Sequence, residues 1–521
     1  MNIIRNKCAL FFVAYISVLH AGDRTFLKNL DSYIEKGMND WGITGIAVGI
    51  VKDNETVYAR GFGKRIIDSE KVIDENSVFA IGSNSKLMTA TALGILVQKE
   101  LITWDSNVID LMPEFKLKDP YVTREITVKD LLSHRAGLPR EDFLWYGSQN
   151  YGRKEIIHRL RFLEPAYTMR GGYIYQNMMF LTAGELIPAV TGQSWDEFLT
   201  EHIFTPLGMV RSVTSVKPLK LMENVAQPHI KVDGKTIKVP YRDIDNVGPA
   251  GSVNSSVTDM IEWMKLHLNS GNVDGNQIVD SVVVDMIHTP HNPFFVSRES
   301  MEIFPSTHFR AYGLGVGLSD YHGRKLLLHT GGIDGMLSLV GMVPNEKLGI
   351  VILTNYSPNN FRPALFYHII DEFFNVESRG WNQFFLEETR KVDEHFTNYE
   401  RIVNENRKRG RSPDFDVDNI MGSYTNDAYG TIEVSRERRE LLFKHWGSSL
   451  LGDLEHWNNN TYRLTWRDPA LSDATDKLFI NFYIDSQSRI KSLRVELIQD
   501  IDIEKGPVFQ EVVFKRDITT K

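Results

Sequence analysis

Ser83 and Lys86 stand at positions i and i+3 of the stretch Gly82-Ser83-Asn84-Ser85-Lys86, where a helical pattern of apolar residues begins. Such positions share one helix face, so the lysine amine can lie beside the serine hydroxyl and lower the cost of removing its proton. Backbone N–H groups at a helix start also favour a developing negative charge. The pattern indicates an activated serine.

The Ser-x-x-Lys spacing alone is a weak signal, because a chain of this length should contain about two by chance. A second pair, Ser488 and Lys491, lies between alternating strand-like runs, where positions i and i+3 point to opposite faces of a strand. Partners elsewhere in the chain must therefore distinguish the first pair from the second.

Two further motifs supply candidate partners for Ser83. Tyr175 and Asn177 lie in a loop just before a helical pattern, and His329-Thr330-Gly331-Gly332 ends a strand-like run, where backbone N–H groups are free to bind an anion. Both motifs have chance twins in the C-terminal region, at 424–426 and 445–447. Only the first set combines a helix-start serine, a loop tyrosine and a strand-end histidine.

Composition excludes several classes of protein. The 521 residues include 59 basic and 67 acidic side chains, a net charge of −8, with no long basic run, which argues against a nucleic-acid partner. His288 and His291 flank Pro290, but without a third ligand in pattern a surface loop is favoured over a zinc site. We therefore expect no metal and no cofactor.

The first 21 residues have the three regions of a secretory signal. Basic residues precede the apolar run Cys8 to Val18, and Leu19-His20-Ala21 offers cleavage after Ala21. The apolar run is too short for a stable membrane span, although a membrane anchor or a buried first helix remains an alternative. Because Cys8 is the only cysteine, the mature chain would carry no disulfide. We expect a secreted or periplasmic protein.

The remaining chain divides into three parts. Residues 22–380 begin with a helix at 25–38 and strand-like runs at 44–51 and 56–61, continue mostly helically over 128–207, and return to strands between 312 and 354. Strands at both ends predict one α/β (α+β) domain whose sheet is completed from distant segments. The cleft would lie between the sheet and the helical insert, with Trp145, Tyr146 and Tyr173 as candidate lining residues.

The C-terminal third has a different composition. Residues 381–414 are rich in charged side chains and predict a solvated helical linker. Residues 415–521 contain six short β-rich runs separated by turns, which predict a separate all-β barrel or sandwich. The six runs are 429–434, 441–445, 461–466, 478–484, 490–497 and 508–514.

The chain resembles the β-lactamase-related serine hydrolases, a family of class C β-lactamases, DD-peptidases, D-aminopeptidases and esterases. The resemblance covers about residues 25–375 and includes the stretches 131–139, 206–209 and 251–260. It implies an antiparallel sheet flanked by helices with a helical insert. The C-terminal part resembles the lipocalin-like barrel often appended to such hydrolases.

The resemblance also implies roles for the candidate residues. Ser83 would be the nucleophile, Lys86 and Tyr175 would share the general base and acid work, and Asn177 would orient Lys86 and a substrate amide. Tyrosine at its ordinary pKa of about 10 is a poor base, so a nearby ammonium would be needed to favour phenolate. Which residue takes the serine proton stays open.

The strand-end motif would complete the site. By the resemblance, the N–H groups of Ser83 and Gly332 form the oxyanion hole, with Gly331 beside them. His329 stands where class C β-lactamases carry lysine, and a histidine with a pKa near about 6.5 is mostly neutral at pH 7. This departure shifts the expected substrate away from β-lactams.

We therefore expect a secreted serine hydrolase that forms an acyl-enzyme at Ser83. Its substrate would be a small molecule or peptide: a peptide, a D-aminoacyl amide or an ester. β-Lactam hydrolysis is the alternative within enzymes, and a catalytically silent penicillin-binding-like module is the alternative outside them. The sequence leaves the oligomeric state open.

Overall fold

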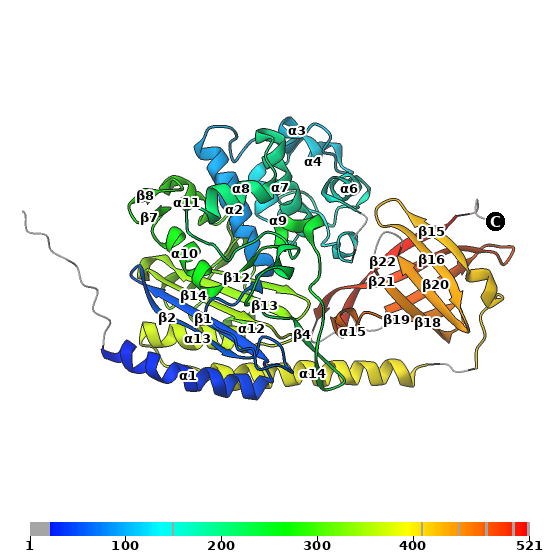
Figure 1. Cartoon of the computed structure of the whole chain (residues 1–521). Helices are drawn as coiled ribbons and strands as arrows, with labels where there is room; N and C mark the ends of the chain where they lie inside the picture. Colours follow the sequence, from blue (N-terminus) through cyan, green and yellow to red (C-terminus); the bar gives the residue numbers. More distant parts are fainter. Residues whose placement is uncertain are drawn as a thin grey trace, which may run out of the picture.

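The computed structural model describes residues 21–147, 151–407, 410–445, 449–474, 478–502 and 506–517. A larger body with helices on both faces of a sheet is followed by a smaller barrel, and helix α14 (Trp381–Glu405) runs beneath both (Figure 1). The expected signal segment, residues 1–21, lies outside the described residues except for Ala21, where helix α1 (Ala21–Trp41) begins. In the described part of the chain, no helix has both the length and the apolar character that a bilayer crossing requires.

An antiparallel sheet of eight strands, in the order β2-β1-β14-β13-β12-β11-β10-β9, forms the centre of the larger body. Strand β1 (Gly45–Lys52) pairs with β2 (Glu55–Gly63) on one side and with β14 (Leu348–Thr354) on the other. The predicted completion of one sheet from both ends of the domain is thus confirmed. The other strands are β9 (Asn292–Phe294), β10 (Arg310–Tyr312), β11 (Gly317–Tyr321), β12 (Arg324–Ile333) and β13 (Met336–Val343).

Helices cover both faces of this sheet because its central strands are apolar on both faces. Ile46, Val48 and Ile50 of β1 belong to the cluster that includes α1 and α13 (Phe361–Phe374), whereas Ala47 and Val51 pack with the helices of the opposite face. That face carries α2 (Ser85–Gln98), α7 (Asn177–Thr191) and α10 (Val257–Leu268). The period of two along the strand therefore separates two cores.

Shorter elements connect these layers. The helices are α3 (Val108–Leu111), α4 (Pro120–Glu125), α5 (Val128–Leu132), α6 (Arg153–Arg159), α8 (Trp195–Leu199), α9 (Gly248–Gly251), α11 (Ser281–Ile287) and α12 (Arg298–Ile303). The strand pairs are β3 (Phe79–Ala80) with β6 (Asn254–Ser255), β4 (His229–Val232) with β5 (Lys235–Lys238), and β7 (Asn272–Val273) with β8 (Asn276–Gln277).

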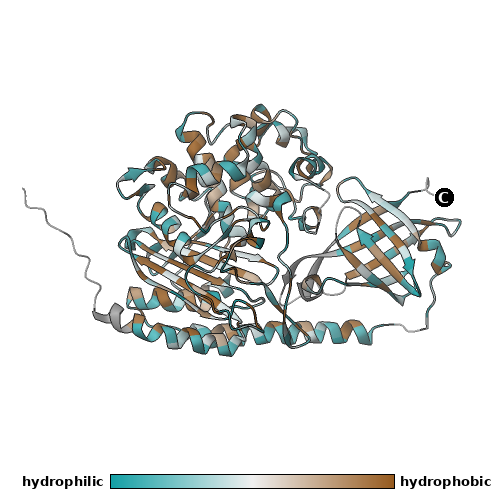
Figure 2. Ribbon diagram, viewed as in Figure 1, coloured by the Kyte–Doolittle hydropathy of each residue, from teal (hydrophilic) through white to brown (hydrophobic). Residues whose placement is uncertain are grey.

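The C-terminal body is a closed barrel of eight strands, in which brown and teal residues alternate along several strands (Figure 2). The sequence predicted six of them and missed β15 and β18. In the second Ser-x-x-Lys pair, Ser488 lies in the turn before β21 and Lys491 within that strand. The elements are β15 (Gly422–Asn426), β16 (Gly430–Glu437), β17 (Glu440–His445), β18 (Leu451–Asn458), β19 (Thr461–Trp466), α15 (Pro469–Ala474), β20 (Leu478–Ile484), β21 (Ile490–Asp502) and β22 (Gly506–Arg516).

Helix α14 contacts both bodies through its two ends. At its start, buried Trp381 donates a 2.6 Å hydrogen bond from Nε1 to Asp371 of α13. Near its end, Glu400 accepts a 2.6 Å hydrogen bond from Arg463, a buried barrel residue. The exposed middle carries ion pairs between neighbouring turns, such as Lys391 with Glu388. The charged segment is therefore helical, and it is packed at both ends.

The close approach of β13 to α13 makes a prediction about stability. A Cβ at Gly341 would lie 2.1 Å from the ring of buried Phe366, so Gly341→Ala overpacks the interface and should lower the free energy of unfolding by about 1–3 kcal/mol. Denaturant unfolding of Gly341→Ala, Phe366→Leu and the double variant measures the coupling between the two sites. Additive losses would contradict a steric origin.

Candidate active site

Ser83 lies in a tight turn of 3₁₀ helix (Gly82–Asn84) between the short strand β3 and helix α2. Gly82 has a φ of +52°, and a Cβ there would lie 2.7 Å from the backbone nitrogen of Gly332 in β12. Only glycine combines this φ with so close an approach at little cost. The turn thus holds the half-exposed Ser83 against the end of β12.

The end of β12 is fastened to the same turn. A Cβ at Gly331 would lie 1.9 Å from the carbonyl oxygen of Ile81, so the two backbones are in direct contact. Ser338 of β13 donates to that carbonyl at 2.6 Å and accepts a 2.7 Å hydrogen bond from Asn84 Nδ2. Because β11 pairs with β12 only as far as Leu328, the segment 329–333 extends beyond β11 into this region.

Lys86 is completely buried one helical turn after Ser83. Its Nζ lies 3.1 Å from Ser83 Oγ, 2.7 Å from Asn177 Oδ1 and 2.7 Å from the carbonyl oxygen of Ala250. The structure therefore brings Ser83, Lys86 and Asn177 together, with a backbone carbonyl as the third neighbour of the amine.

Burial lowers the pKa of Lys86 well below its usual 10.5, and the nearby Asp142 carboxylate opposes this shift only in part. A neutral amine has two N–H donors and one lone pair. Asn177 Oδ1 and the Ala250 carbonyl can only accept, so they take the two donors. In the structure Nζ also donates to Ser83 Oγ; once the amine is neutral, its lone pair is left for the hydroxyl proton of Ser83. This arrangement can remove a proton from the serine.

Tyr175 lies beside this pair with its ring centroid 4.7 Å from Lys86 Nζ. Burial raises the pKa of its phenol well above 10, and a hydrogen bond with the Ser83 side chain opposes that rise. The ring packs on His134, whose Nδ1 accepts a 3.0 Å hydrogen bond from the Gln176 N–H. Tyr175 is thus a neutral phenol within reach of Ser83. A role as the base would require a phenolate stabilised by a nearby ammonium, and the raised pKa opposes that state.

Asn177 begins helix α7, and its amide is oriented by Asp142. Its Nδ2 donates to Asp142 Oδ1 at 2.8 Å, which turns Oδ1 of the amide toward Lys86. The carboxylate is held in turn by Trp145 Nε1 at 2.7 Å and Arg140 Nε at 2.6 Å. The chain Arg140–Asp142–Asn177–Lys86 therefore fixes the direction of each polar group.

His329 is buried, and both of its ring nitrogens have protein partners. Nδ1 lies 2.7 Å from the Thr330 carbonyl oxygen, which can only accept, so Nδ1 carries the proton and Nε2 accepts from the Tyr312 hydroxyl at 2.7 Å. Burial and the nearby Lys86 lower the pKa of His329 to about 3, and the ring is neutral at pH 7. It contacts Tyr312 and offers no fixed cation.

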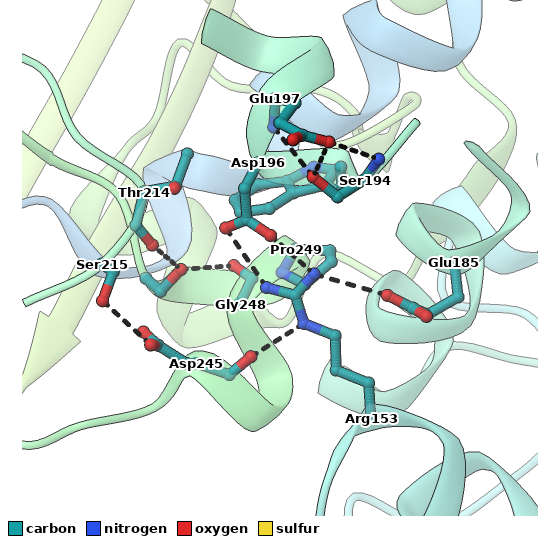
Figure 3. Close-up of polar contacts among 12 residues, drawn as sticks. Arg153, Glu185, Ser194, Asp196, Glu197, Thr214, Ser215, Asp245, Gly248 and Pro249 are labelled. Carbon is teal, nitrogen blue, oxygen red and sulfur yellow. Dashed lines mark hydrogen bonds and ion pairs between the residues drawn. The ribbon is translucent and has the colours of Figure 1, made fainter. Parts of the chain in front are cut away.

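A half-buried polar network lies beside α9, the helix whose Ala250 carbonyl accepts from Lys86. Figure 3 shows Arg153 of this network among Asp196, Asp245 and Gly248. Arg153 donates a 2.8 Å hydrogen bond from Nε to the Asp245 carbonyl and forms a 2.9 Å ion pair with Asp196. Thr89 of α2 donates to the Pro249 carbonyl at 2.7 Å. Thr89 therefore holds α9 against α2, and the next carbonyl, that of Ala250, accepts from Lys86.

A cavity of about 670 Å³ opens in front of Ser83. Ser83, Asn177 and Gly332 line it, as do Trp145 and Tyr146, two of the three aromatic candidates for the cleft. The third, Tyr173, packs instead against Phe294, His134 and Tyr312. Barrel residues line the same cavity on its far side.

Three groups of this site were missed from the sequence. Asp142 begins a short 3₁₀ turn (Asp142–Leu144) without a recurring pattern, and Ser338 is one of many serines. The Ala250 carbonyl is a backbone group and has no side-chain signature. Only the small-residue run 248–252, just before and overlapping the stretch 251–260 of the family resemblance, could have drawn attention to a close backbone approach.

The two histidines considered for zinc have other surroundings. His288 is buried, with Nε2 at 3.1 Å from Nδ1 of His267, so the expectation of a surface loop was wrong for this residue. The apolar faces of α10 and α11 bury both rings. Within the described ranges, no three His, Cys, Asp or Glu side chains are grouped as a metal site.

Comparison with known proteins gives two family matches. The model described as Beta-lactamase matches residues 30–372, and a domain of unknown function, DUF3471, matches residues 406–516. The first match contains all seven candidate site residues, and the second contains the barrel strands β15–β22.

Similar proteins cover different shares of the chain. Unguisins hydrolase ungD of Aspergillus violaceofuscus is 28% identical and covers 76% of this chain and 74% of its own length. Penicillin-binding protein 4 of Amycolatopsis lactamdurans is 26% identical over 58% of this chain and 79% of its own. The octameric penicillin-binding protein homologue from Pyrococcus abyssi matches with a TM-score of 0.61 and 20% identity, over 93% of this chain and 99% of that one. This last likeness concerns the fold alone.

The buried Lys86 amine predicts how stability depends on pH. Its pKa is lower in the folded than in the unfolded chain, so the folded state binds fewer protons between those two values. As pH falls below about 10.4, the free energy of unfolding of the wild type should therefore decrease relative to that of Lys86→Met. The decrease should be up to about 1.4 kcal/mol per pH unit until the pKa of Lys86 in the folded state is reached. Denaturant unfolding from pH 6 to pH 9 measures the difference. A constant difference over that range would contradict a neutral lysine.

Proposed function

The chain belongs to the beta-lactamase family, and from this premise we propose that it is a secreted serine hydrolase that forms an acyl-enzyme at Ser83. The proposed substrates are peptides, D-aminoacyl amides or esters. The observation that carries the proposal is the buried Lys86 amine, 3.1 Å from Ser83 Oγ and held by two groups that can only accept. When this amine is neutral, its lone pair is left for the Ser83 hydroxyl. An oriented amine of lowered pKa is what a serine nucleophile needs.

The proposed reaction begins with transfer of the Ser83 proton to Lys86 as Oγ attacks the substrate carbonyl carbon. The negative charge on the carbonyl oxygen is stabilised by the N–H groups of Ser83 and Gly332, two residues that line the cavity. Tyr175 donates its phenolic proton to the leaving group and regains one from Lys86. Water then attacks the acyl-enzyme through the same groups in reverse.

The charges around the cavity favour uncharged acyl groups over β-lactams. A penicillin carries a carboxylate, and the His329 ring is neutral and occupied by Tyr312 and Thr330. Arg140 pairs with Asp142 at 2.6 Å, so this nearby cation is already neutralised. β-Lactam hydrolysis therefore remains the second candidate, supported by the family and by the penicillin-binding relatives.

A catalytically silent binding module is the alternative outside enzymes. Such a module would not need a buried amine beside a serine, with acceptor groups held in fixed positions around that amine. Hydrogen bonds link the side chains of Arg140, Asp142, Asn177 and Lys86 in a row, and they fix the position of the Lys86 amine. This network favours an enzyme.

Covalent labelling tests the nucleophile. Incubation of the full chain with a fluorophosphonate should modify Ser83, located by mass spectrometry of the peptides, and Ser83→Ala should abolish labelling. Lys86→Gln should slow labelling by about 10²–10⁴-fold, the usual contribution of a positioned general base. Ser488→Ala is the matched control, because it removes the serine of the second Ser-x-x-Lys pair and should change nothing.

The same experiment separates the candidates. Persistent labelling by a fluorescent penicillin would indicate a peptidase-like site with slow deacylation, whereas rapid turnover of nitrocefin would promote β-lactam hydrolysis. No adduct at Ser83 with either reagent would overturn the enzyme proposal in favour of the binding module.

Export is the part of the proposal that rests on residues 1–21. When the full-length chain is produced in a bacterium with a secretory pathway, the exported protein should begin at Gly22, by sequencing of its N-terminus. Ala21→Trp should block cleavage, because the processing site requires small residues. Protein that retains residues 1–21 and stays in the cytoplasm would contradict the proposal.

A further inference from the structure

The C-terminal barrel forms one wall of the cavity in front of Ser83. Five of its residues line that cavity together with Ser83, Asn177 and Gly332 of the larger body. They come from the loop before β18, the end of β19, helix α15 and the start of β20, and are Leu450, Trp466, Ala470, Leu471 and Leu478.

Contacts at the active-site loop hold the barrel in this place. The Ser449 N–H donates a 2.8 Å hydrogen bond to the Gly147 carbonyl, and a Cβ at Gly147 would lie 2.7 Å from the Leu450 side chain. Tyr429 donates a hydrogen bond to Glu141, a neighbour of Asp142. The barrel therefore packs on the loop that orients Asn177.

A second contact joins the barrel to the end of β12. Arg242 forms a 2.7 Å ion pair with Asp334, two residues after Gly332, and a 2.5 Å ion pair with Asp468, which directly precedes α15. Ala470 of α15 packs in a small apolar cluster with Ile230 and Val239. All three charged side chains are mostly buried, so breaking this contact would strand charges away from water.

The wall that the barrel contributes is apolar. Opposite it, the larger body adds the apolar side chains Trp145, Ile244, Val247 and Leu337 to the same cavity. The four charged side chains that line the cavity all have partners: Arg140 pairs with Asp142, and Tyr429 donates to Glu141. The fourth, Asp334, binds Arg242 and Tyr146. A volume of about 670 Å³ with this lining suits a large uncharged group.

We propose that the barrel is part of the substrate-binding site, and that the substrate places a large apolar group between Ser83 and the wall formed by Leu450, Trp466 and Leu471. This inference rests on the proposed serine hydrolase and adds its substrate class: esters or amides whose acyl group is a long aliphatic chain or a bulky apolar side chain. Trp466 and Leu471 set the preference for that group.

The test compares two p-nitrophenyl esters that differ only in the acyl chain, octanoate and acetate. The full-length wild type should prefer octanoate in kcat/KM. Leu471→Gln and Trp466→Leu, changes on α15 and β19, should each lower the octanoate-to-acetate ratio about tenfold or more, because each removes apolar contact from the long chain alone.

Leu442→Gln is the matched control, because it puts the same side chain at a half-buried position of β17 outside the cavity. Its ratio should stay within about twofold of the wild type. Fluorophosphonate labelling of Ser83 in every variant shows that the nucleophile is intact. The two cavity variants lie on different elements, so the test still has a result if one of them fails to fold.

Two results would overturn the inference while leaving the serine hydrolase in place: wild-type preference for acetate, or ratios unchanged in both cavity variants that still label at Ser83. A wild-type chain without labelling at Ser83 would instead overturn the proposed function. The two failures are therefore distinguishable.

Discussion

The burial of one amine governs the arrangement around it. A lysine deprived of water keeps a charge only at high cost, so Lys86 must be either paired with an anion or neutral. Two neutral acceptors bind the Lys86 amine, the side-chain oxygen of Asn177 and the backbone carbonyl of Ala250. The Asp142 carboxylate binds the amide of Asn177 and reaches Lys86 only through it. These two acceptors, with burial, favour the neutral amine over the ammonium, and α7 and α9 supply them to Lys86 of α2.

Backbone proximity is the second constraint. Gly82 and Gly331 allow the turn of Ser83 and the end of β12 to touch without side chains between them. Any Cβ at either place would push the strand away and enlarge the space between the N–H groups of Ser83 and Gly332. The glycines are therefore as much a part of the site as the residues that carry chemistry, and the Ser338–Ile81 hydrogen bond holds the result in place.

Local patterns allowed much of this molecule to be predicted. Helix α1 and strands β1 and β2 lie where the sequence placed a helix and two strands, and Ser83, Lys86 and Asn177 meet as their motifs indicated. Groups that act through tertiary contact escaped prediction: the Ala250 carbonyl has no side-chain signal, and Asp142 gains its role only from Asn177. Strand β15 is short and polar, and β18 alternates around Asp453 and Glu455, so neither stood out from a loop. The neutral state of His329 depends on its burial, and Tyr312, which binds its Nε2, was linked to it by no spacing.

The pairing of β1 with β14 has a consequence for how the chain acquires its structure. These strands are hydrogen-bonded along their whole length, yet about 300 residues separate Lys52 from Leu348. At a synthesis rate of about 5–20 residues per second, β1 waits roughly 15–60 s for its second neighbour. During that time its apolar edge is open to other chains, and contacts of such long range also slow folding itself. The barrel, whose strands pair mostly with their neighbours in sequence, has no such delay. The larger body is therefore the part whose folding most needs protection from aggregation.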